Sequence, residues 1–215
     1  MADTVWQRLC WTLVCVVFTV SSRHFSAYYD FKKAFDWVSY HKLRVKLRPY
    51  GITGNLVICL TEFVHGRSHT VKLGDSHSHS VYVANDVLQG TVLGPTLFLL
   101  FIDDICDIFD ELNVKCKLYA DNIKLYSCYN VNVPQHDLMI AIGRLHNWSL
   151  TWQLQIASDK CFVCTVSNVR HNPGCSSTAY GISNQMFASV VCVRNLGVMI
   201  DSKLKFDKHI AGIVH

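Results

Sequence analysis

The sequence predicts a fold of the α+β class, in which helices and short strands share one core. Half of the 215 residues are hydrophobic and 17% are charged, so the chain can bury a sizeable core and is not intrinsically disordered. Some segments repeat apolar residues at helical spacing, whereas others alternate apolar and polar residues on both sides of a tight turn. The length suits one domain, or a domain with a small appendage.

Charge and cysteine content leave several classes of partner open. The net charge of +4 permits a polyanionic partner without demanding one. Ten cysteines are many for a cytosolic protein, but they are not spaced densely as in small disulfide-rich secreted domains. The mean hydropathy of +0.20 is high for a complete soluble domain. It indicates either a membrane segment or an apolar surface that meets a partner.

The N-terminal segment is apolar and leaves two interpretations open. Residues 9–20 read LCWTLVCVVFTV, a run of 12 residues, whereas a helix that spans a bilayer needs about 20. We therefore expect no stable membrane insertion. Arg8 before the run and Ser21-Ser22 after it fit a signal peptide, but Asp3 weakens the positive charge that such a peptide needs. Residues 1–23 are thus an apolar leader. It is either signal-like, or a buried strand or helix, or foreign sequence joined to a domain that begins near residue 24.

The first regular elements are a strand and two helices. Residues 26–31, SAYYDF, are rich in aromatic residues and predict a strand. Residues 40–47 predict a short helix that Pro49 ends. A second helix is expected to begin with Asn55 as its cap and to run to about residue 65. Its apolar face is expected to contain Leu56, Cys59, Leu60 and Phe63.

A hairpin and an apolar helix follow. Residues 68–73 and 80–87 alternate apolar and polar side chains around Gly74-Asp75-Ser76, which predicts a β-hairpin. Gly94-Pro95 then opens an apolar helix that runs to about residue 105.

The C-terminal half repeats this mixture of hairpin and helix. Residues 114–118 and 123–126 flank a tight turn at Ala120-Asp121-Asn122. A helix is predicted for residues 134–148, with an apolar stripe of Leu138, Ile142, Leu145 and Trp148. Short strands are expected near residues 154, 162 and 193–200.

Two aspartates lie where these elements suggest chemistry. Asp30 lies in an apolar strand, in which an ionised side chain is costly unless it is paired or binds a cation. Asp121 lies at the tip of a predicted hairpin. Either residue alone is better explained as a hydrogen-bonded turn residue. If both strands join one sheet, however, the carboxylates meet at one edge and form the kind of two-metal site that performs phosphoryl transfer.

Five segments, in order, carry a resemblance to one family. Residues 28–43, YYDFKKAFDWVSYHKL, resemble motif A of the reverse transcriptases of non-LTR (LINE-like) retrotransposons. Residues 86–105, DVLQGTVLGPTLFLLFIDDI, resemble motif B, and residues 117–126, KLYADNIKLY, are similar to motif C, the Tyr-Ala-Asp-Asp hairpin. Residues 154–161, LQIASDKC, resemble motif D, and residues 193–210 resemble the primer-grip segment with the start of the thumb.

The resemblance implies a right-hand polymerase palm, an antiparallel sheet backed by helices. It assigns residues 24–192 to the palm and residues 193–215 to the primer-grip segment and the start of the thumb. The family has a basic fingers subdomain before motif A, whereas 29 residues precede Asp30. We therefore expect the fingers to be largely missing, and the chain to be truncated and impaired.

The resemblance also implies the catalytic and metal-binding residues. Asp30 and Asp121 match the metal-binding aspartates, and the backbone carbonyl of Phe31 matches a further ligand. Lys160 matches the motif D lysine, which protonates or neutralises the departing pyrophosphate. Asn122 stands at the position of the second motif C aspartate. Because an amide keeps the turn geometry but carries no charge, weaker metal binding is expected.

Substrate contacts follow from the same matches. Phe35 matches the bulky residue that stacks under the sugar of the incoming nucleotide and excludes a 2′-hydroxyl. Gln89 and Gly90 match the motif B pair near the template and nucleotide, where glycine lets the backbone approach closely. Leu196 and Gly197 match the turn of the primer grip.

The implied function is that of an RNA-directed DNA polymerase. Its cofactor would be Mg²⁺, as two ions, or Mn²⁺, and its partners an RNA template, a DNA primer and deoxynucleoside triphosphates. The family implies a nuclear or cytoplasmic location, whereas residues 1–22 acting as a signal peptide would imply secretory entry. Two alternatives stay open: a non-catalytic nucleic-acid-binding relic of such a domain, and a secreted disulfide-bonded protein.

Other charged residues have no unique role in the sequence. The helix predicted after Ser39 carries two basic i,i+4 pairs, which suit a phosphate backbone or a solvent-exposed face equally. These pairs are Lys42 with Lys46 and Arg44 with Arg48. Arg67 is expected to be structural, and Leu88 replaces the family's usual proline, which loosens a turn.

Overall fold

The computed structural model describes residues 23–129, 136–166, 180–182, 185–195 and 197–214. They form two compact units. The first, here called the sheet unit, comprises the described parts of Met1–Asp30, Ile105–Asn147 and Ile156–His215. The second, here called the helical unit, comprises Phe31–Asp104 and Trp148–Gln155. The predicted leader, residues 1–22, lies outside the described residues.

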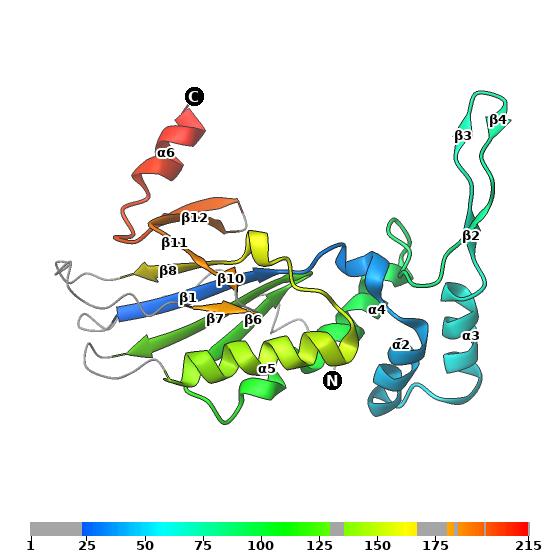
Figure 1. The fold of residues 1–215 in the computed structure, drawn as a ribbon, viewed down its shortest axis with the longest axis horizontal. Helices are drawn as coiled ribbons and strands as arrows, with labels where there is room; N and C mark the ends of the chain where they lie inside the picture. Colours follow the sequence, from blue (N-terminus) through cyan, green and yellow to red (C-terminus); the bar gives the residue numbers. More distant parts are fainter. Residues whose placement is uncertain (1–22, 130–135, 167–179, 183–184, 196, 215) are drawn as a thin grey trace. The chain divides into compact units, whose positions relative to one another are not determined.

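A five-stranded sheet forms the centre of the sheet unit (Figure 1). Its strands lie in the order β11-β8-β1-β7-β6. Their bounds are Arg23–Asp30 for β1, Lys115–Tyr119 for β6, Asn122–Tyr129 for β7, Phe162–Val166 for β8 and Ala188–Val190 for β11. The expected antiparallel sheet is wrong in one pair, because β11 runs parallel to β8 and the sheet is therefore mixed. Parallel pairing is possible here because a long connection between these strands returns the chain in the same direction.

Along β1 the register separates a face that is buried throughout from a face that is buried at Ser26 and half-buried at Tyr28 and Asp30. Side chains alternate along β1, so Phe25, Ala27 and Tyr29 share one face and are all buried. Their cross-strand neighbours Ile123 and Leu125 are buried on the same face. The opposite face carries the intervening residues of β1, and Asp30 is the last of them.

Helix α5 (His136–Trp152) lies along this sheet (Figure 1). It continues about one turn beyond the predicted end at residue 148. All four members of its predicted apolar stripe are buried, as are the side chains of Ala141 and Ser149. The stripe therefore anchors the helix as helical periodicity predicts.

Shorter elements complete the sheet unit. They are the 3-10 turns Asp107–Phe109 and Ser158–Lys160, the hairpin of β9 (Gly181–Ile182) and β10 (Gln185–Met186), the hairpin of β12 (Cys192–Asn195) and β13 (Val198–Asp201), and α6 (Asp207–Val214).

The prediction of a strand near residue 154 is wrong. Leu154 is buried in an irregular segment, where its N–H donates to the carbonyl of Ser149 over 3.1 Å.

The helical unit contains the remaining helices, close to their predicted positions. They are α2 (Tyr40–Leu47), α3 (Gly54–Val64) and α4 (Leu93–Ile102), with 3-10 turns at Ala34–Trp37, Arg48–Tyr50 and Asp103–Ile105. In α3 the expected apolar face is wrong in part. Leu60 and Phe63 are half-buried, but Leu56 is 56% exposed and Cys59 is exposed, and the buried residues are Val57 and Val64. Thr53, not Asn55, is the N-cap residue of this helix.

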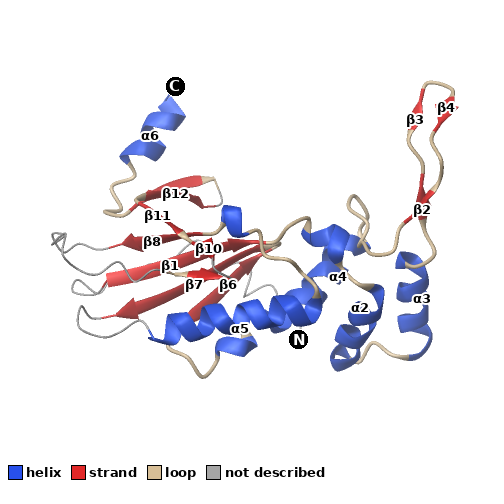
Figure 2. Ribbon diagram, viewed as in Figure 1, coloured by secondary structure: helices blue, strands red, loops and turns tan. Residues whose placement is uncertain are grey.

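A long hairpin also belongs to the helical unit (Figure 2). Its strands are β2 (Ser68–His69), β3 (Lys72–Leu73), β4 (Ser76–His77) and β5 (Val81–Tyr82), and all are exposed. The predicted turn is confirmed, with Gly74 at φ +59° between β3 and β4. Among the helices that the structure describes, none combines the length and the apolar character that crossing a membrane requires.

Candidate active site

The two predicted metal-binding aspartates lie at one end of the sheet. Asp30 ends β1 and is registered opposite Asn122, the first residue of β7. The β6–β7 hairpin pairs Tyr119 with Asn122, so Ala120 and Asp121 form its two-residue turn. Ala120 has φ +49°, a left-handed conformation that side chains disfavour and that the tight connection requires. Local chain geometry thus carries Asp121 to the strand end at which Asp30 lies.

Lys160 joins this group from the predicted motif D. Its Nζ donates to Oδ2 of Asp30 over 2.8 Å. Two backbone hydrogen bonds fix this arrangement: the N–H of Ala157 donates to the carbonyl of Asp30, and the N–H of Lys160 donates to the carbonyl of Ala157, each over 2.8 Å. Its hydrogen bond with the Asp30 carboxylate, reinforced by their charge attraction, raises the pKa of Lys160 and keeps it protonated.

Asp121 is held in a less favourable electrostatic environment. Burial raises the pKa of its carboxyl group, and the negative charge of Asp30 raises it further, whereas Lys160 opposes the shift. Asn122 donates from Nδ2 to Oδ1 of Asp121 over 3.3 Å. The residue at the second motif C position therefore presents a hydrogen-bond donor to this carboxylate.

The donor set fits a hard divalent cation. Magnesium is usually held by one or two carboxylates together with water and substrate phosphates, and Asp30 and Asp121 supply two carboxylates. Within the described residues, no group of three or more His, Cys, Asp or Glu side chains is placed to hold a metal ion. Backbone or amide oxygens, water and the substrate itself could supply further ligands.

Residues matched to substrate contacts lie in the helical unit. Phe35 stacks on Phe98 with ring centroids 4.4 Å apart and an interplanar angle of 21°. Its carbonyl accepts a hydrogen bond from the N–H of Val87 over 3.0 Å, which joins motif A to the start of motif B. Gln89 and Gly90 follow and are exposed. Gly90 has φ +82°, and a Cβ added to it would have no atom within 4 Å. The backbone conformation, not lack of space, therefore explains why this residue is glycine.

The remaining matched residues are Phe31 and the primer-grip pair. The side chain of Phe31 is buried, with its ring 6.1 Å from that of Trp148. Gly197 has φ +87° in the connection between β12 and β13, a conformation that favours glycine. Leu196 lies outside the described residues.

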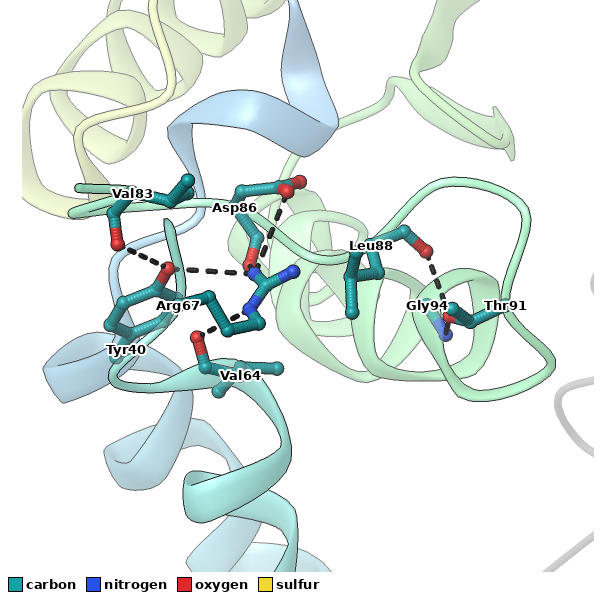
Figure 3. Close-up of polar contacts among 8 residues, drawn as sticks. All are labelled: Tyr40, Val64, Arg67, Val83, Asp86, Leu88, Thr91 and Gly94. Carbon is teal, nitrogen blue, oxygen red and sulfur yellow. Dashed lines mark hydrogen bonds and ion pairs between the residues drawn. The ribbon is translucent and has the colours of Figure 1, made fainter. Parts of the chain in front are cut away.

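Arg67, which the sequence predicts to be structural, is the centre of a polar network (Figure 3). Its guanidinium donates to the carbonyl of Val64 over 3.0 Å and to that of Asp86 over 2.9 Å, and it lies 3.5 Å from Oδ2 of Asp86. The hydroxyl of Tyr40 donates to the carbonyl of Val83 over 3.0 Å. Arg67 thereby binds Asp86, in the segment that directly precedes Gln89. No local pattern signals this role, because Tyr40 and Asp86 are distant from Arg67 in sequence.

A second polar chain shapes the turn after Leu88 (Figure 3). The hydroxyl of Thr91 donates to the carbonyl of Leu88 over 2.8 Å and accepts from the N–H of Gly94 over 3.1 Å. A Cβ on Gly94 would lie 2.1 Å from the Leu88 carbonyl oxygen. Side-chain hydrogen bonds and close backbone contact therefore fix the turn although Leu88 replaces proline.

The basic pairs of α2 do not form one phosphate-binding face. Lys46 is buried, forms an ion pair with Asp104 and lies 3.7 Å from the ring centroid of Trp152. The Nζ of Lys42 donates to the carbonyl of Thr151. Only Arg44 and Arg48 are exposed. One predicted pair, Lys42 with Lys46, is thus engaged within the helical unit.

Comparison with known proteins identifies the family. Residues 7–200 match the family described as reverse transcriptase (RNA-dependent DNA polymerase). The chain belongs to the reverse transcriptase family.

Its relatives are reverse transcriptases of non-LTR retrotransposons. The chain is 27% identical over 197 residues to the RNA-directed DNA polymerase from mobile element jockey of Drosophila funebris, covering 88% of this chain and 21% of the relative. It is 28% identical over 196 residues to the probable RNA-directed DNA polymerase from transposon X-element of Drosophila melanogaster, covering 87% and 20%. This reverse transcriptase chain thus spans about one fifth of the length of these relatives.

Solved telomerase structures share the fold of this reverse transcriptase. Apo telomerase from Candida tropicalis, truncated from its C-terminal domain, aligns with a TM-score of 0.60 at 10% identity, covering 95% of this chain and 38% of that chain. Telomerase from Candida albicans, solved with a fragment of telomeric RNA, aligns with a TM-score of 0.54 at 12% identity, covering 95% of this chain and 34% of that chain.

Proposed function

We propose that this chain is the palm of an RNA-directed DNA polymerase of a non-LTR retrotransposon, and that Asn122 impairs it. The observation that carries the proposal is the placement of Asp30, Asp121 and Lys160 at one end of the sheet. Family membership supports the reaction class. The reaction joins a deoxynucleotide to a DNA primer on an RNA template.

The reaction divides into roles for these residues. The primer 3′-oxygen forms a bond to the α-phosphorus, the bond to the bridging oxygen breaks, pyrophosphate leaves and the hydroxyl proton passes to solvent. Asp30 and Asp121, with the Phe31 carbonyl, would hold Mg²⁺ or Mn²⁺, which activates the attacking oxygen and stabilises the phosphate charge. Asn122 would supply only an amide. Lys160 would neutralise the charge of the departing pyrophosphate or donate a proton to it.

Substrate recognition is assigned to the helical unit and the primer grip. Phe35 would stack against the sugar and exclude a 2′-hydroxyl, while Gln89 and Gly90 would contact the template and nucleotide. Leu196 and Gly197 would hold the primer.

Primer extension on an RNA template with Mg²⁺ or Mn²⁺ tests the proposal. We expect weak incorporation by the natural chain, at least tenfold more by Asn122→Asp, and none by Asp30→Ala in either background. Because the added carboxylate supplies the missing metal ligand, the gain should be largest at low metal concentration. Robust incorporation by the natural chain would contradict impairment, and inactivity of Asn122→Asp would contradict the catalytic assignment.

A non-catalytic nucleic-acid-binding role is the second candidate. The hydrogen bond from Asn122 to Asp121 favours it, because it engages a carboxylate that the reaction needs. This candidate predicts salt-sensitive binding of RNA or DNA that survives Asp30→Ala. Metal-dependent nucleotide binding that Asp30→Ala abolishes would instead favour the polymerase.

A further inference from the structure

Asp86 lies in a backbone conformation that normally favours glycine. Its φ is +153°, in the region that side chains disfavour. In the described part of the chain, the other non-glycine residues with positive φ have values from +45° to +62°, the left-handed helical region that such residues can adopt. Asp86 is therefore the exception among the described residues, and its surroundings must hold it in place.

Arg67 contacts Asp86 through both its peptide and its side chain (Figure 3). One guanidinium nitrogen, Nη2, donates to the Asp86 carbonyl over 2.9 Å and lies 3.5 Å from Oδ2 of the carboxylate. The N–H of Asp86 donates to the carbonyl of Val38 over 3.2 Å. Arg67 is itself fixed, because its Nε donates to the carbonyl of Val64 and its Nη2 lies 3.5 Å from the hydroxyl of Tyr40. The strained residue is therefore held at its N–H, its carbonyl and its carboxylate.

Stability alone does not explain this arrangement. Burial raises the pKa of the Asp86 carboxyl group, and Arg67 opposes that shift only in part. The ion pair therefore gains little, because desolvation of the two half-buried side chains offsets their attraction. Glycine at this position would keep both backbone hydrogen bonds and remove the strain. An aspartate that is both strained and partly buried needs a further reason.

The segment that Asp86 begins is attached to Phe35. The N–H of Val87 donates to the Phe35 carbonyl over 3.0 Å, and Val87 is completely buried. The ring of Phe35 stacks on Phe98, which limits its own freedom to move. Gln89 follows two residues after Val87. A shift of Asp86 would therefore change the distance between the Phe35 ring and Gln89.

We propose that Arg67 and Asp86 are positioning residues for the selection of deoxyribose over ribose. They hold the Gln89-Gly90 segment at a fixed distance from the ring of Phe35. The inference rests on the proposed function, in which Phe35 excludes a 2′-hydroxyl. Steric exclusion of one hydroxyl works only if the walls of the site cannot move apart. A strained backbone that an arginine holds in place supplies this rigidity.

Hydrogen exchange followed by mass spectrometry tests the positioning without nucleotide. In the natural chain the amides of Asp86 and Val87 are bonded to the carbonyls of Val38 and Phe35. Arg67→Lys keeps the charge but loses the planar guanidinium, so we expect these two amides to exchange about tenfold faster. Unchanged exchange in Arg67→Lys would overturn the proposal.

Nucleotide binding tests the selection of the sugar. dATP and ATP are titrated with Mn²⁺ on an RNA template whose DNA primer ends in a dideoxynucleotide, so that no bond forms. We expect the natural chain to prefer dATP, and both Arg67→Lys and Asp86→Gly to reduce the ratio of the two dissociation constants about five- to tenfold. Phe35→Ala should also reduce this ratio. Adding Arg67→Lys to Phe35→Ala should reduce it no further, because the positioning acts through Phe35.

Asp104→Ala is the control that separates positioning from stability. It breaks an ion pair with Lys46 in the same unit, so it should lower the free energy of unfolding and leave the ratio unchanged. Asp86→Gly should do the reverse, because removal of the strain offsets the lost ion pair. A ratio that follows stability in every variant, or full discrimination in Arg67→Lys, would overturn the proposal.

Failure of the proposed function would give a different result. If the natural chain binds neither nucleotide, the polymerase assignment is wrong and the selection of the sugar is overturned with it. The exchange experiment would still show whether Arg67 holds Asp86, because it needs neither nucleotide nor turnover.

Discussion

Lys160 donates from Nζ to Oδ2 of Asp30 over 2.8 Å, across 130 residues of sequence. The lysine side chain is 60% exposed and the aspartate side chain is 21% exposed. A cation that approaches Asp30 therefore meets a carboxylate already paired with an ammonium group. The pair protects Asp30 without metal and must loosen if the carboxylate binds one.

Lys160→Met is expected to strengthen metal binding while lowering any polymerase activity. Removing the competing ammonium should improve Mn²⁺ affinity roughly two- to fivefold, since exposed ion pairs contribute little to stability. Turnover should fall, because the pyrophosphate loses a neutralising charge. Calorimetric titration of Mn²⁺ measures the first effect, and primer extension by the Asn122→Asp chain measures the second.

The matched control is Lys72→Met in β3, which removes the same charge far along the chain from motif D. It should change neither Mn²⁺ affinity nor turnover. Unchanged or weaker Mn²⁺ binding by Lys160→Met would show that the lysine does not compete for Asp30.

Gly94→Ala is expected to disrupt the turn that leads into α4. Its Cβ would lie 2.1 Å from the carbonyl oxygen of Leu88, so the backbone must shift and the hydrogen bond to Thr91 must weaken. We expect a loss of about 3 kcal/mol in the free energy of unfolding. Urea denaturation followed by tryptophan fluorescence measures it, because Trp148 and Trp152 belong to the same unit.

Gly143→Ala provides the opposite expectation in the same assay. Gly143 lies inside α5, and a Cβ there would contact nothing within 4 Å. Alanine should stabilise the helix by about 0.5–1 kcal/mol. Similar destabilisation by both substitutions would show that contact with Leu88 is not the cause.

Lys46 and Asp104 should respond unequally to substitution. The Lys46 ammonium is buried against the rings of Trp152 and Trp148, at 3.7 and 5.0 Å from their centroids, whereas Asp104 is 41% exposed. Asp104→Ala leaves a buried charge without its partner and should cost about 2–3 kcal/mol. Lys46→Met keeps the apolar packing and should cost less than about 1 kcal/mol.

The double variant decides between charge and packing. If the unpaired ammonium causes the loss, adding Lys46→Met to Asp104→Ala should restore stability in urea denaturation. Trp148 also donates to Asp104 over 3.1 Å, and loss of that bond persists in the double variant. If the losses in free energy of unfolding of the two single variants simply add in the double variant, the charge explanation is contradicted.

The sequence was sufficient for features that depend on neighbouring residues. Alternation and turn residues predicted the β6–β7 hairpin and the placement of Asp121, and helical periodicity predicted α5. Pairing the two strands that each carry an aspartate also predicted that Asp30, at the end of β1, lies near Asp121. Local patterns therefore predicted that the two aspartates lie close together, whereas the role of Lys160 came from the resemblance to the family.

Features that depend on distant residues could not be predicted in this way. Nothing near Lys46 indicates that Asp104 and Trp152 will surround it, so an apparently basic helix face proved to be partly core. The prediction of the buried side of α3 was wrong in part because the helix is apolar on more than one side. Only packing against the rest of the chain determines that Val57 and Val64 are buried. The parallel pairing of β11 with β8 likewise depends on a long connection between them.

Cys161, next to Lys160, is expected to be far less reactive than Cys59. Its Sγ is buried and donates to the carbonyl of Ala157 over 3.3 Å. Burial raises the pKa of this thiol to about 11, and the thiolate is the reactive form. The neutral thiol therefore contributes to stability below pH 9, and this contribution is lost as the pH rises through 11.

Alkylation with iodoacetamide at pH 8, followed by mass spectrometry, tests this difference. In the folded chain the exposed Cys59 should be modified at least about 50-fold faster than Cys161. In denaturant the two rates should become similar, and each added pH unit should raise the folded rate at Cys161 about tenfold while the fold persists. Rapid modification of Cys161 at pH 8 would show that the turn holding Lys160 opens readily from the end of β1.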